Sequence, residues 1–288
     1  MSPTVFTGKN VIVQGITGRQ GRFHTQRMLE YGSSIIAGTS LSKAGTHVCG
    51  IPVFASLDDI KQQLSISIDI SVIFVPAPTA KAAVMEAIRA QVPLIVCITE
   101  HIPVHDMLYI RQQLAHSQSV LIGPNSPGVL MPEKRLLGIM PGSFSTVGTT
   151  AVVSRSGTLT YEVMSLLTGA GFGQKYIIGI GGDMIQGSSF VDCLKLFEHD
   201  DGVERVLLIG EVGGTAEIAA ADYIASSMSK PVYAYIAGQC APPGVQLGHA
   251  GAILGTNALE SAQAKTTYLG RSGAVTASNL SQLISMMK

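Results

Sequence analysis

Short, continuous apolar runs recur along the first half of the chain and predict five β-strands. They occupy residues 10–14, 34–38, 70–75, 94–98 and 120–123. Strands that are apolar throughout, rather than at every second position, are typical of a parallel sheet covered by helices on both faces. The segments between them predict helices through Met28 and Tyr31, over about 80–90 and over about 105–115. This alternation of strand and helix is typical of a nucleotide-binding βαβ fold.

The same alternation returns in the second half of the chain. We expect strands at residues 150–153, 176–180, 206–209 and 232–236, and helices from near Ser156 to about Gly169, at 190–198, at about 258–265 and at 280–286. A segment with several prolines and glycines separates the halves and is typical of a connection. We therefore predict an α/β protein with a Rossmann-like domain at residues 1–124, an interdomain crossover at 125–147 and a flavodoxin-like α/β domain at 148–288.

A glycine-rich turn joins the first predicted strand to its helix. It runs from Gly15 to Gly21 (GITGRQG), and free amides at the start of such a helix can bind a pyrophosphate. The second strand ends without the acid that would hold an NAD ribose, and Lys43 follows instead. This favours an adenosine with an extra phosphate, as in CoA or NADP. Ligands should gather at the carboxyl ends of the strands, which include residues 76–78 and 98–100.

Three features of the second half are candidates for chemistry. Ser156 and Thr158 precede a predicted helix and could form an anion site with its free amides, although Ser156 could equally be an ordinary N-cap. Glu211 follows a buried strand, where site residues concentrate. His249 has glycine before it and a small residue after it, so its ring is open to attack or movement. The alternative for His249 is a loop histidine that caps a neighbouring group.

Composition narrows the classes of function. The 288 residues carry a formal net charge of zero, so the sequence gives no electrostatic sign of nucleic acid or anionic membrane binding. Only 13% of residues are charged, about half the usual share, which suggests extensive subunit contacts. The cysteines (Cys49, Cys97, Cys193, Cys240) lack paired spacing, so we expect reduced thiols and no metal site. No signal segment or apolar run of about 20 residues is found, and we expect a cytoplasmic, bacterial protein.

Several catalytic motifs are absent from the sequence. The chain contains no G-x-x-x-x-G-K-[ST] phosphate loop, no G-x-S-x-G nucleophile motif and no H-E-x-x-H metal pair. We therefore do not expect nucleotide hydrolysis by this chain alone.

Taken together, seven segments resemble the α subunit of succinyl-CoA synthetase (succinate–CoA ligase), in the same order and over nearly the whole chain. They are residues 15–21, 98–100, 123–125, 154–161, 179–183, 210–214 and 248–252. The resemblance implies an acid–thiol ligase that forms succinyl-CoA through an acyl phosphate and a phosphohistidine. It implies CoA as a ligand and ATP or GTP with Mg²⁺ on an ATP-grasp β subunit, in an αβ or α2β2 assembly.

The resemblance also assigns roles to individual residues. His249 matches the phosphorylated histidine and Glu211 matches the carboxylate that orients it. The helix that starts near Ser156, Gly157 and Thr158 matches the one whose N-terminus faces the phosphohistidine, and Tyr161 matches a substrate-side position. The residues that match CoA contacts are Thr17, Gly18, Arg19, Gln20, Lys43, Ile98, Thr99 and Glu100.

Four segments depart from the family pattern. Ser126 stands where the family usually has cysteine, and the other departures are at residues 41–45, 243–246 and 254–259. Two alternative functions therefore stay open. One is a ligase for malate or another dicarboxylate, and the other is a CoA-binding regulatory or scaffold protein that has lost turnover. An NADP dehydrogenase is a more distant alternative, because the sequence offers no set of residues for hydride transfer.

Overall fold

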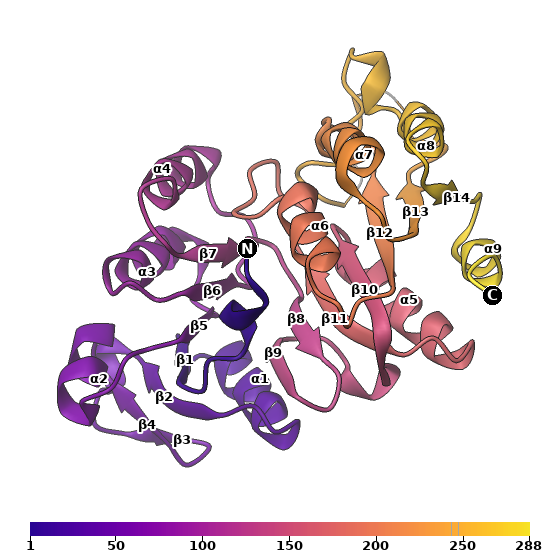
Figure 1. The fold of residues 1–288 in the computed structure, drawn as a ribbon. Helices are drawn as coiled ribbons and strands as arrows, with labels where there is room; N and C mark the ends of the chain where they lie inside the picture. Colours follow the sequence, from indigo (N-terminus) through magenta and orange to yellow (C-terminus); the bar gives the residue numbers. More distant parts are fainter. Residues whose placement is uncertain (243, 247) are drawn as a thin grey trace.

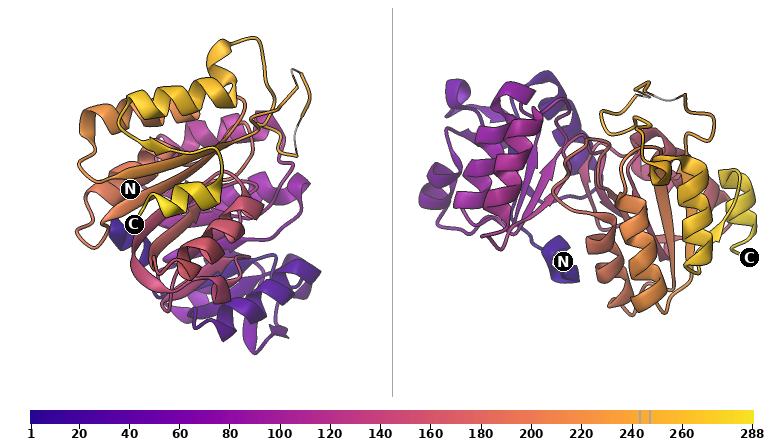
Figure 2. Two further views of the ribbon diagram at one scale, coloured as in Figure 1. Left: turned by 90° about the vertical axis from the view of Figure 1, so that its right-hand side faces the viewer. Right: turned by 90° about the horizontal axis from the view of Figure 1, so that it is seen from above.

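The structure is a computed structural model that describes residues 1–242, 244–246 and 248–288. Two seven-stranded sheets, each with helices on both faces, follow one another along the chain and form two lobes (Figures 1 and 2). The predicted α/β class with two successive sheets is confirmed. Of the predicted departures from the family, the position of Pro243 lies outside the described residues.

The first sheet is parallel apart from one edge strand. Its order is β3-β4-β2-β1-β5-β6-β7, and only β3 pairs antiparallel, with β4. The strands are β1 (Val11–Gln14), β2 (Ile35–Thr39), β3 (His47–Val48), β4 (Ile51–Phe54), β5 (Ile70–Ile73), β6 (Leu94–Cys97) and β7 (Val120–Ile122). The strands that follow β1 in sequence, β2 to β4, lie on one side of it, and β5 to β7 lie on the other side. Ligands of open α/β sheets bind beyond the carboxyl ends at this kind of reversal.

Helices cover both faces of the first sheet. The helix α1 (Arg19–Glu30) covers one face, and α2 (Leu57–Leu64), α3 (Ala77–Arg89) and α4 (Val104–Leu114) cover the other. The apolar pattern of the sequence did not predict α2, β3 or β4. The two strands are too short to show a period, and α2 depends on a local signal, the Ser56 side chain that accepts a hydrogen bond from the Asp59 amide.

The second sheet has a parallel centre and an antiparallel hairpin at one edge. Its order is β14-β13-β12-β10-β11-β8-β9. The strands are β8 (Gly128–Met131), β9 (Arg135–Gly138), β10 (Val147–Ser154), β11 (Gln174–Gly179), β12 (Arg205–Glu211), β13 (Val232–Ala237) and β14 (Val275–Thr276). The helix α5 (Gly157–Gly169) lies on one face with α9 (Leu280–Ser285), while α6 (Phe190–Glu198), α7 (Ala216–Ser227) and α8 (Ala262–Arg271) lie on the other (Figure 1).

Two predictions for the second half need correction. The segment 125–147 was expected to be a connection, but β8 and β9 within it form a hairpin that pairs with β11. The residues of β8 are all buried, so this part of the connection belongs to the second sheet. The helix expected near 258–265 is broken at Ser261, whose side chain caps α8 after the short 3-10 turn η4 (Ala258–Glu260). The domain boundaries themselves stay predictions.

One apolar core joins the two lobes. Alternate residues of β1 face opposite ways, so that Val11 and Val13 belong to a cluster that continues into the second sheet. Ile12 belongs to a separate cluster under α2, α3 and α4. The ring of Phe6, in the N-terminal 3-10 turn η1 (Pro3–Phe6), packs 5.8 Å from the ring of Tyr176 on β11. The carboxyl ends of both sheets are therefore held in place relative to each other.

In the part of the chain that the structure describes, no helix is long and apolar enough to span a membrane. Within the same residues, no group of three or more histidine, cysteine, aspartate or glutamate side chains is placed to hold a metal ion.

We expect Gly21→Ala to disrupt the turn between β1 and α1. A Cβ atom at Gly21 would lie 2.2 Å from the carbonyl oxygen of Gly15, so the helix would have to move away from the turn. Overpacking of this kind costs about 1–3 kcal/mol. Urea unfolding should show that loss, and calorimetry should show weaker CoA binding. Gly169→Ala is the matched control, because its Cβ would meet nothing within 4 Å and alanine is the better helix former. Equal stability of the two variants would contradict the prediction.

Candidate active site

The larger cavity of the first lobe lies at the carboxyl ends of β1 and β5. It has a volume of about 1210 Å³, and Thr17, Gly18, Arg19 and Gln20 line it. Gly18 is the N-cap of α1, so the free amides of the first turn of the helix are available for an anion. Four of the predicted CoA residues therefore come together here.

The cations at this cavity differ from the prediction. Lys43, at the end of the exposed 3-10 turn η2 (Leu41–Lys43), does not line the cavity, whereas Leu41 of the same turn does. Arg89, from the last turn of α3, also lines it together with Arg19. Arg89 could not be predicted from the sequence, because only the fold brings α3 beside the glycine turn.

A second cleft continues from this cavity towards the second lobe. Its volume is about 570 Å³, and Gln20 and the segment 74–76 line both spaces. The predicted residues that line it are Gln20, Ile98, Thr99, Glu100, Gly157, Thr158, Tyr161 and His249. The cleft therefore connects the expected CoA residues of the first sheet with the expected phosphate residues of the second.

Ser156 is the predicted phosphate residue that does not line the cleft. Its hydroxyl accepts a hydrogen bond from the Leu159 amide at 3.3 Å, which makes it the N-cap of α5. The sequence left two roles open for this segment, an N-cap and an anion site. Ser156 is the N-cap, while the next residues, Gly157 and Thr158, line the cleft and remain candidates for the anion site. Nearby, burial raises the pKa of Tyr161, so that its hydroxyl stays protonated and can donate a hydrogen bond.

His249 and Glu211 meet at the edge of this cleft. The Nδ1 atom of His249 lies 2.6 Å from Oε2 of Glu211, and the two side chains are 25% and 7% exposed. This hydrogen bond raises the pKa of His249, although burial of the ring acts in the opposite direction. The ring also packs on Gly182, where a Cβ atom would lie 2.3 Å from Cγ of the imidazole. The ionised carboxylate only accepts, so Nδ1 carries the proton and Nε2 keeps its lone pair.

A buried arginine accompanies the pair. Arg155, 4% exposed, follows β10 and places Nε 3.1 Å from Oε1 of Glu211, close enough for an ion pair although the two atoms are not aligned for a hydrogen bond. Its Nη2 donates to the carbonyl oxygen of Asp183 at 3.2 Å. A Cβ atom at Gly251 would lie 2.4 Å from Nη2, so the guanidinium also lies against the histidine loop. Arg155 therefore ties three loops of the site together.

Asp183 adds a second buried carboxyl near the histidine. It is 7% exposed, and its Oδ1 accepts a hydrogen bond from Nδ2 of Asn125 at 3.0 Å. Burial raises the pKa of this carboxyl, while the Asn125 hydrogen bond and the nearby His101 and His249 lower it. The charges that act on His249 therefore come from Glu211, Asp183 and Arg155.

Ser126 has a structural role in the turn that lines the cleft. Its hydroxyl donates to the Gly179 carbonyl at 2.5 Å and accepts from the Gly128 amide at 2.8 Å, and the residue is 3% exposed. We expect Ser126→Ala to lose about 1–3 kcal/mol of unfolding free energy, because both backbone groups lose a buried partner. Urea unfolding measures this, with the exposed Ser226→Ala as control. A change below about 0.5 kcal/mol for both variants would contradict it.

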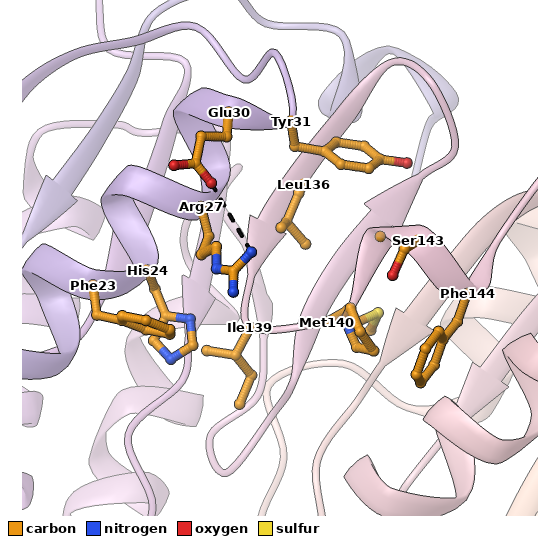
Figure 3. A pocket seen from close by; sticks show the side chains of 12 residues that line it. Phe23, His24, Arg27, Glu30, Tyr31, Leu136, Ile139, Met140, Ser143 and Phe144 are labelled. Atoms are coloured by element: carbon orange, nitrogen blue, oxygen red, sulfur yellow. Dashed lines mark ion pairs between the residues drawn. The ribbon is translucent and has the colours of Figure 1, made fainter.

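A third cavity adjoins the cleft but contains none of the predicted site residues. Its volume is about 450 Å³, and it lies between α1 and the segment after β9 (Figure 3). Ile139 lines both this cavity and the cleft, and His24 stacks on Phe74 with ring centroids 5.6 Å apart. Burial lowers the pKa of His24, and the neighbouring Arg27 lowers it further. The side chain of Ile139 therefore separates this cavity from the cleft.

The sequence matches known families over most of its length. Residues 6–101 match the CoA binding domain family and residues 153–275 match the CoA-ligase family. The chain is 49% identical to the α subunit of an ADP-forming succinate–CoA ligase from Methanothermobacter thermautotrophicus over 95% of this chain and 92% of that one. It is 46% identical to the same subunit from Staphylococcus aureus over 97% and 92%. It is 50% identical to subunit alpha 2 from Archaeoglobus fulgidus over 92% and 91%.

Solved structures share the fold at lower identity. ATP citrate lyase from Methanothrix soehngenii, in complex with citrate and coenzyme A, superposes with a TM-score of 0.87 at 23% identity, over 97% of this chain and 50% of that one. A dinucleotide-forming acetyl-coenzyme A synthetase from Ca. Korarchaeum cryptofilum gives a TM-score of 0.76 at 19% identity, over 98% and 60%. With relatives of 46–50% identity over nearly its full length, the chain belongs to the family of α subunits of ADP-forming succinate–CoA ligases, which are CoA-binding acid–thiol ligases.

Proposed function

We propose that this chain uses His249 as the phosphoryl carrier of a succinate–CoA ligase. In the direction of thioester synthesis, Nε2 of His249 attacks the γ-phosphorus of a nucleoside triphosphate and releases the diphosphate. A carboxylate oxygen of succinate then takes the phosphoryl group from the histidine and forms an acyl phosphate. The thiolate of CoA attacks the acyl carbon, the C–O bond to phosphate breaks, and succinyl-CoA and phosphate result.

The observation that carries this proposal is the hydrogen bond from Nδ1 of His249 to Glu211 at the edge of the cleft. The bond fixes one tautomer and makes the opposite nitrogen a better nucleophile. Gly157 and Thr158 line the same cleft at the start of α5, where free amides and the helix dipole favour a phosphoryl group. Phosphohistidine chemistry needs these features together, namely a free ring nitrogen, a carboxylate on the other one and an anion site nearby.

We assign CoA to the larger cavity of the first lobe and to the cleft that continues from it towards the second lobe. Its diphosphate suits the amides at the start of α1, and its adenosine suits the larger cavity, where Arg19 and Arg89 supply positive charge. The pantetheine arm would pass Gln20, which lines both cavities, and reach Glu100 and His249 in the cleft. Because Lys43 does not line the cavity, we assign it a weaker role than the sequence suggested.

The nucleotide, ATP or GTP with Mg²⁺, is assigned to an ATP-grasp β subunit. Two observations support the assignment. The sequence has no phosphate loop, and the relatives are named as α subunits, which implies a partner chain. The ADP-forming names of the relatives favour ATP over GTP.

The proposal is tested by phosphorylation of the assembled enzyme. The chain is mixed with its candidate β subunit, Mg²⁺ and ATP or GTP labelled at the γ-phosphate. We expect label that is labile in acid and stable in base, as phosphohistidine is. Succinate with CoA should then discharge the label, whereas malate with CoA should not. A folded complex without label would overturn the phosphohistidine mechanism, and discharge by malate alone would overturn the choice of succinate.

A further inference from the structure

The backbone of Glu211 is held on both sides by ionised side chains that come from two helices behind the site. Oε1 of Glu217, in the first turn of α7, accepts the amide hydrogen of Glu211 at 3.1 Å. Nζ of Lys265, on α8, donates to the carbonyl oxygen of Glu211 at 2.7 Å. Neither side chain lines the cleft, and both are fully buried.

Lys265 has no hydrogen-bonding capacity left over. Its ammonium also donates to the carbonyl oxygen of Gly213 at 2.6 Å and to Oε2 of Glu217 at 2.5 Å, which uses all three of its hydrogens. Burial lowers the pKa of Lys265, and the contact with Glu217 opposes that effect. A lysine with no exposed surface and three ordered acceptors has a fixed position, unlike the mobile lysines of a protein surface.

The segment after Glu211 contains two glycines, so its backbone needs contacts such as these to fix its position. Gly213 and Gly214 follow the strand with φ angles of +91° and +59°, a region that glycine enters easily. The Gly213 carbonyl is one of the three acceptors of Lys265. The pair between Glu211 and His249 is only 2.6 Å long, so a small shift of the strand end would break it. Misplacement of a catalytic group by about 1 Å can cost about 100-fold in rate.

The charges of this buried cluster are balanced. Glu211 and Glu217 supply two negative charges, and Arg155 and Lys265 supply two positive ones. The pairs are Arg155 with Glu211 at 3.1 Å, Arg155 with Glu217 at 4.0 Å and Lys265 with Glu217 at 2.5 Å. An uncompensated buried charge is costly, so each carboxylate of this cluster depends on a cation beside it.

We propose that Lys265 and Glu217 are positioning residues for His249 phosphorylation, which act by holding the backbone of Glu211 and by balancing the charge of its carboxylate. This inference rests on the proposed function. It explains why two charged residues are buried where neither the nucleotide nor the acid can reach them. Neither residue is assigned contact with a substrate.

The proposal gives a signed prediction for pH dependence. The charged or titratable groups that face His249 or its partner come from five segments. They are Glu211 on β12, Arg155 after β10, Asp183 after β11, Glu217 on α7 and Lys265 on α8. Lys265→Met leaves the cluster with a net negative charge, which raises the pKa of His249. Glu217→Gln leaves a net positive charge, which lowers it. The double variant is neutral again.

The test measures single-turnover phosphorylation of His249 against pH in the α–β complex, with γ-labelled ATP and Mg²⁺. Each single variant should phosphorylate about 10- to 100-fold more slowly than wild type, the usual scale for residues that orient a catalytic group. The acid limb of the profile should move to higher pH for Lys265→Met and to lower pH for Glu217→Gln. In Lys265→Met/Glu217→Gln the limb should return to the wild-type position.

Lys230→Met is the matched control. Lys230, in the same lobe, donates to the carbonyl oxygens of Phe197 and Asp200 at 2.7 and 2.6 Å, away from His249. Its replacement should leave the acid limb and the rate of phosphorylation unchanged. Equal slowing at every pH, or wild-type rates in both single variants, would overturn the inference. If Lys265→Met does not fold, Glu217→Gln and the neutral double variant still decide it. Absence of label on wild type would instead overturn the proposed function.

Discussion

Replacing His249 by asparagine is expected to abolish both labelling by γ-phosphate and formation of the thioester. The variant removes Nε2, the ring nitrogen opposite the one that bonds to the Glu211 carboxylate. Loss of an enzyme nucleophile lowers turnover by on the order of 10⁶-fold. The measurements are the label retained on the chain in base and the steady-state rate with succinate, CoA and ATP.

His101 provides a control inside the same cleft. It lines the cleft as His249 does, but its side chain is 79% exposed and its Nε2 lies 3.7 Å from Glu100 rather than within a hydrogen bond. His101→Asn should keep full labelling. The assignment of His249 fails if His249→Asn is still labelled or if His101→Asn loses the label instead.

The sequence predicted the elements that a local pattern can encode. Apolar runs of four or five residues located the central strands, and α6 was predicted with the bounds that the structure has. The turn from Gly15 to Gly21 was identified because spacing alone places glycines between a strand and a helix. These elements depend on residues that are close in the sequence, so a local sequence pattern is enough to predict them.

Features that depend on distant parts of the chain were missed. The hairpin of β8 and β9 was predicted as a connection, because its pairing with β11 depends on residues about 50 positions further along the chain. Arg155 and Lys265 are long charged side chains, which a sequence pattern assigns to the surface, yet they are 4% and 0% exposed. Their burial is possible because Glu211, 56 positions after Arg155, and Glu217, 48 positions before Lys265, supply opposite charges.

The family resemblance supplied what neither pattern nor period could. From the residues alone, His249 could have been a capping histidine, and nothing in the spacing joined it to Glu211, 38 positions earlier. The structure brings them together because β12 and β13 are parallel neighbours. Glu211 at the end of β12 and the loop that begins after β13 therefore lie at the same edge of the second sheet. The roles of both residues in phosphoryl transfer stay predictions.

Glu211→Gln is expected to lower the rate of His249 phosphorylation by about 10³- to 10⁴-fold, the scale seen when the carboxylate that orients a catalytic histidine becomes an amide. Glutamine keeps the size of the side chain. It loses the charge, however, and its amide can present a hydrogen to Nδ1 and so favour the wrong tautomer. Arg155, whose Nε lies 3.1 Å from Oε1 of Glu211, would also lose its charge partner.

The pH dependence distinguishes this role from a loss of packing. Because the hydrogen bond to Glu211 raises the pKa of His249, the variant should have a lower imidazole pKa, and the acid limb of its rate should move to lower pH while the plateau falls.

The contribution of this hydrogen bond to folding stability also depends on pH. A raised pKa in the folded state stabilises the wild type below the ordinary histidine pKa, and this contribution disappears as pH rises through the raised value. Glu211→Gln should therefore lose more unfolding free energy at pH 6 than at pH 9 in parallel urea titrations. An equal loss at both pH values, with an unmoved acid limb, would mean that Glu211 supports the loop without acting on the imidazole.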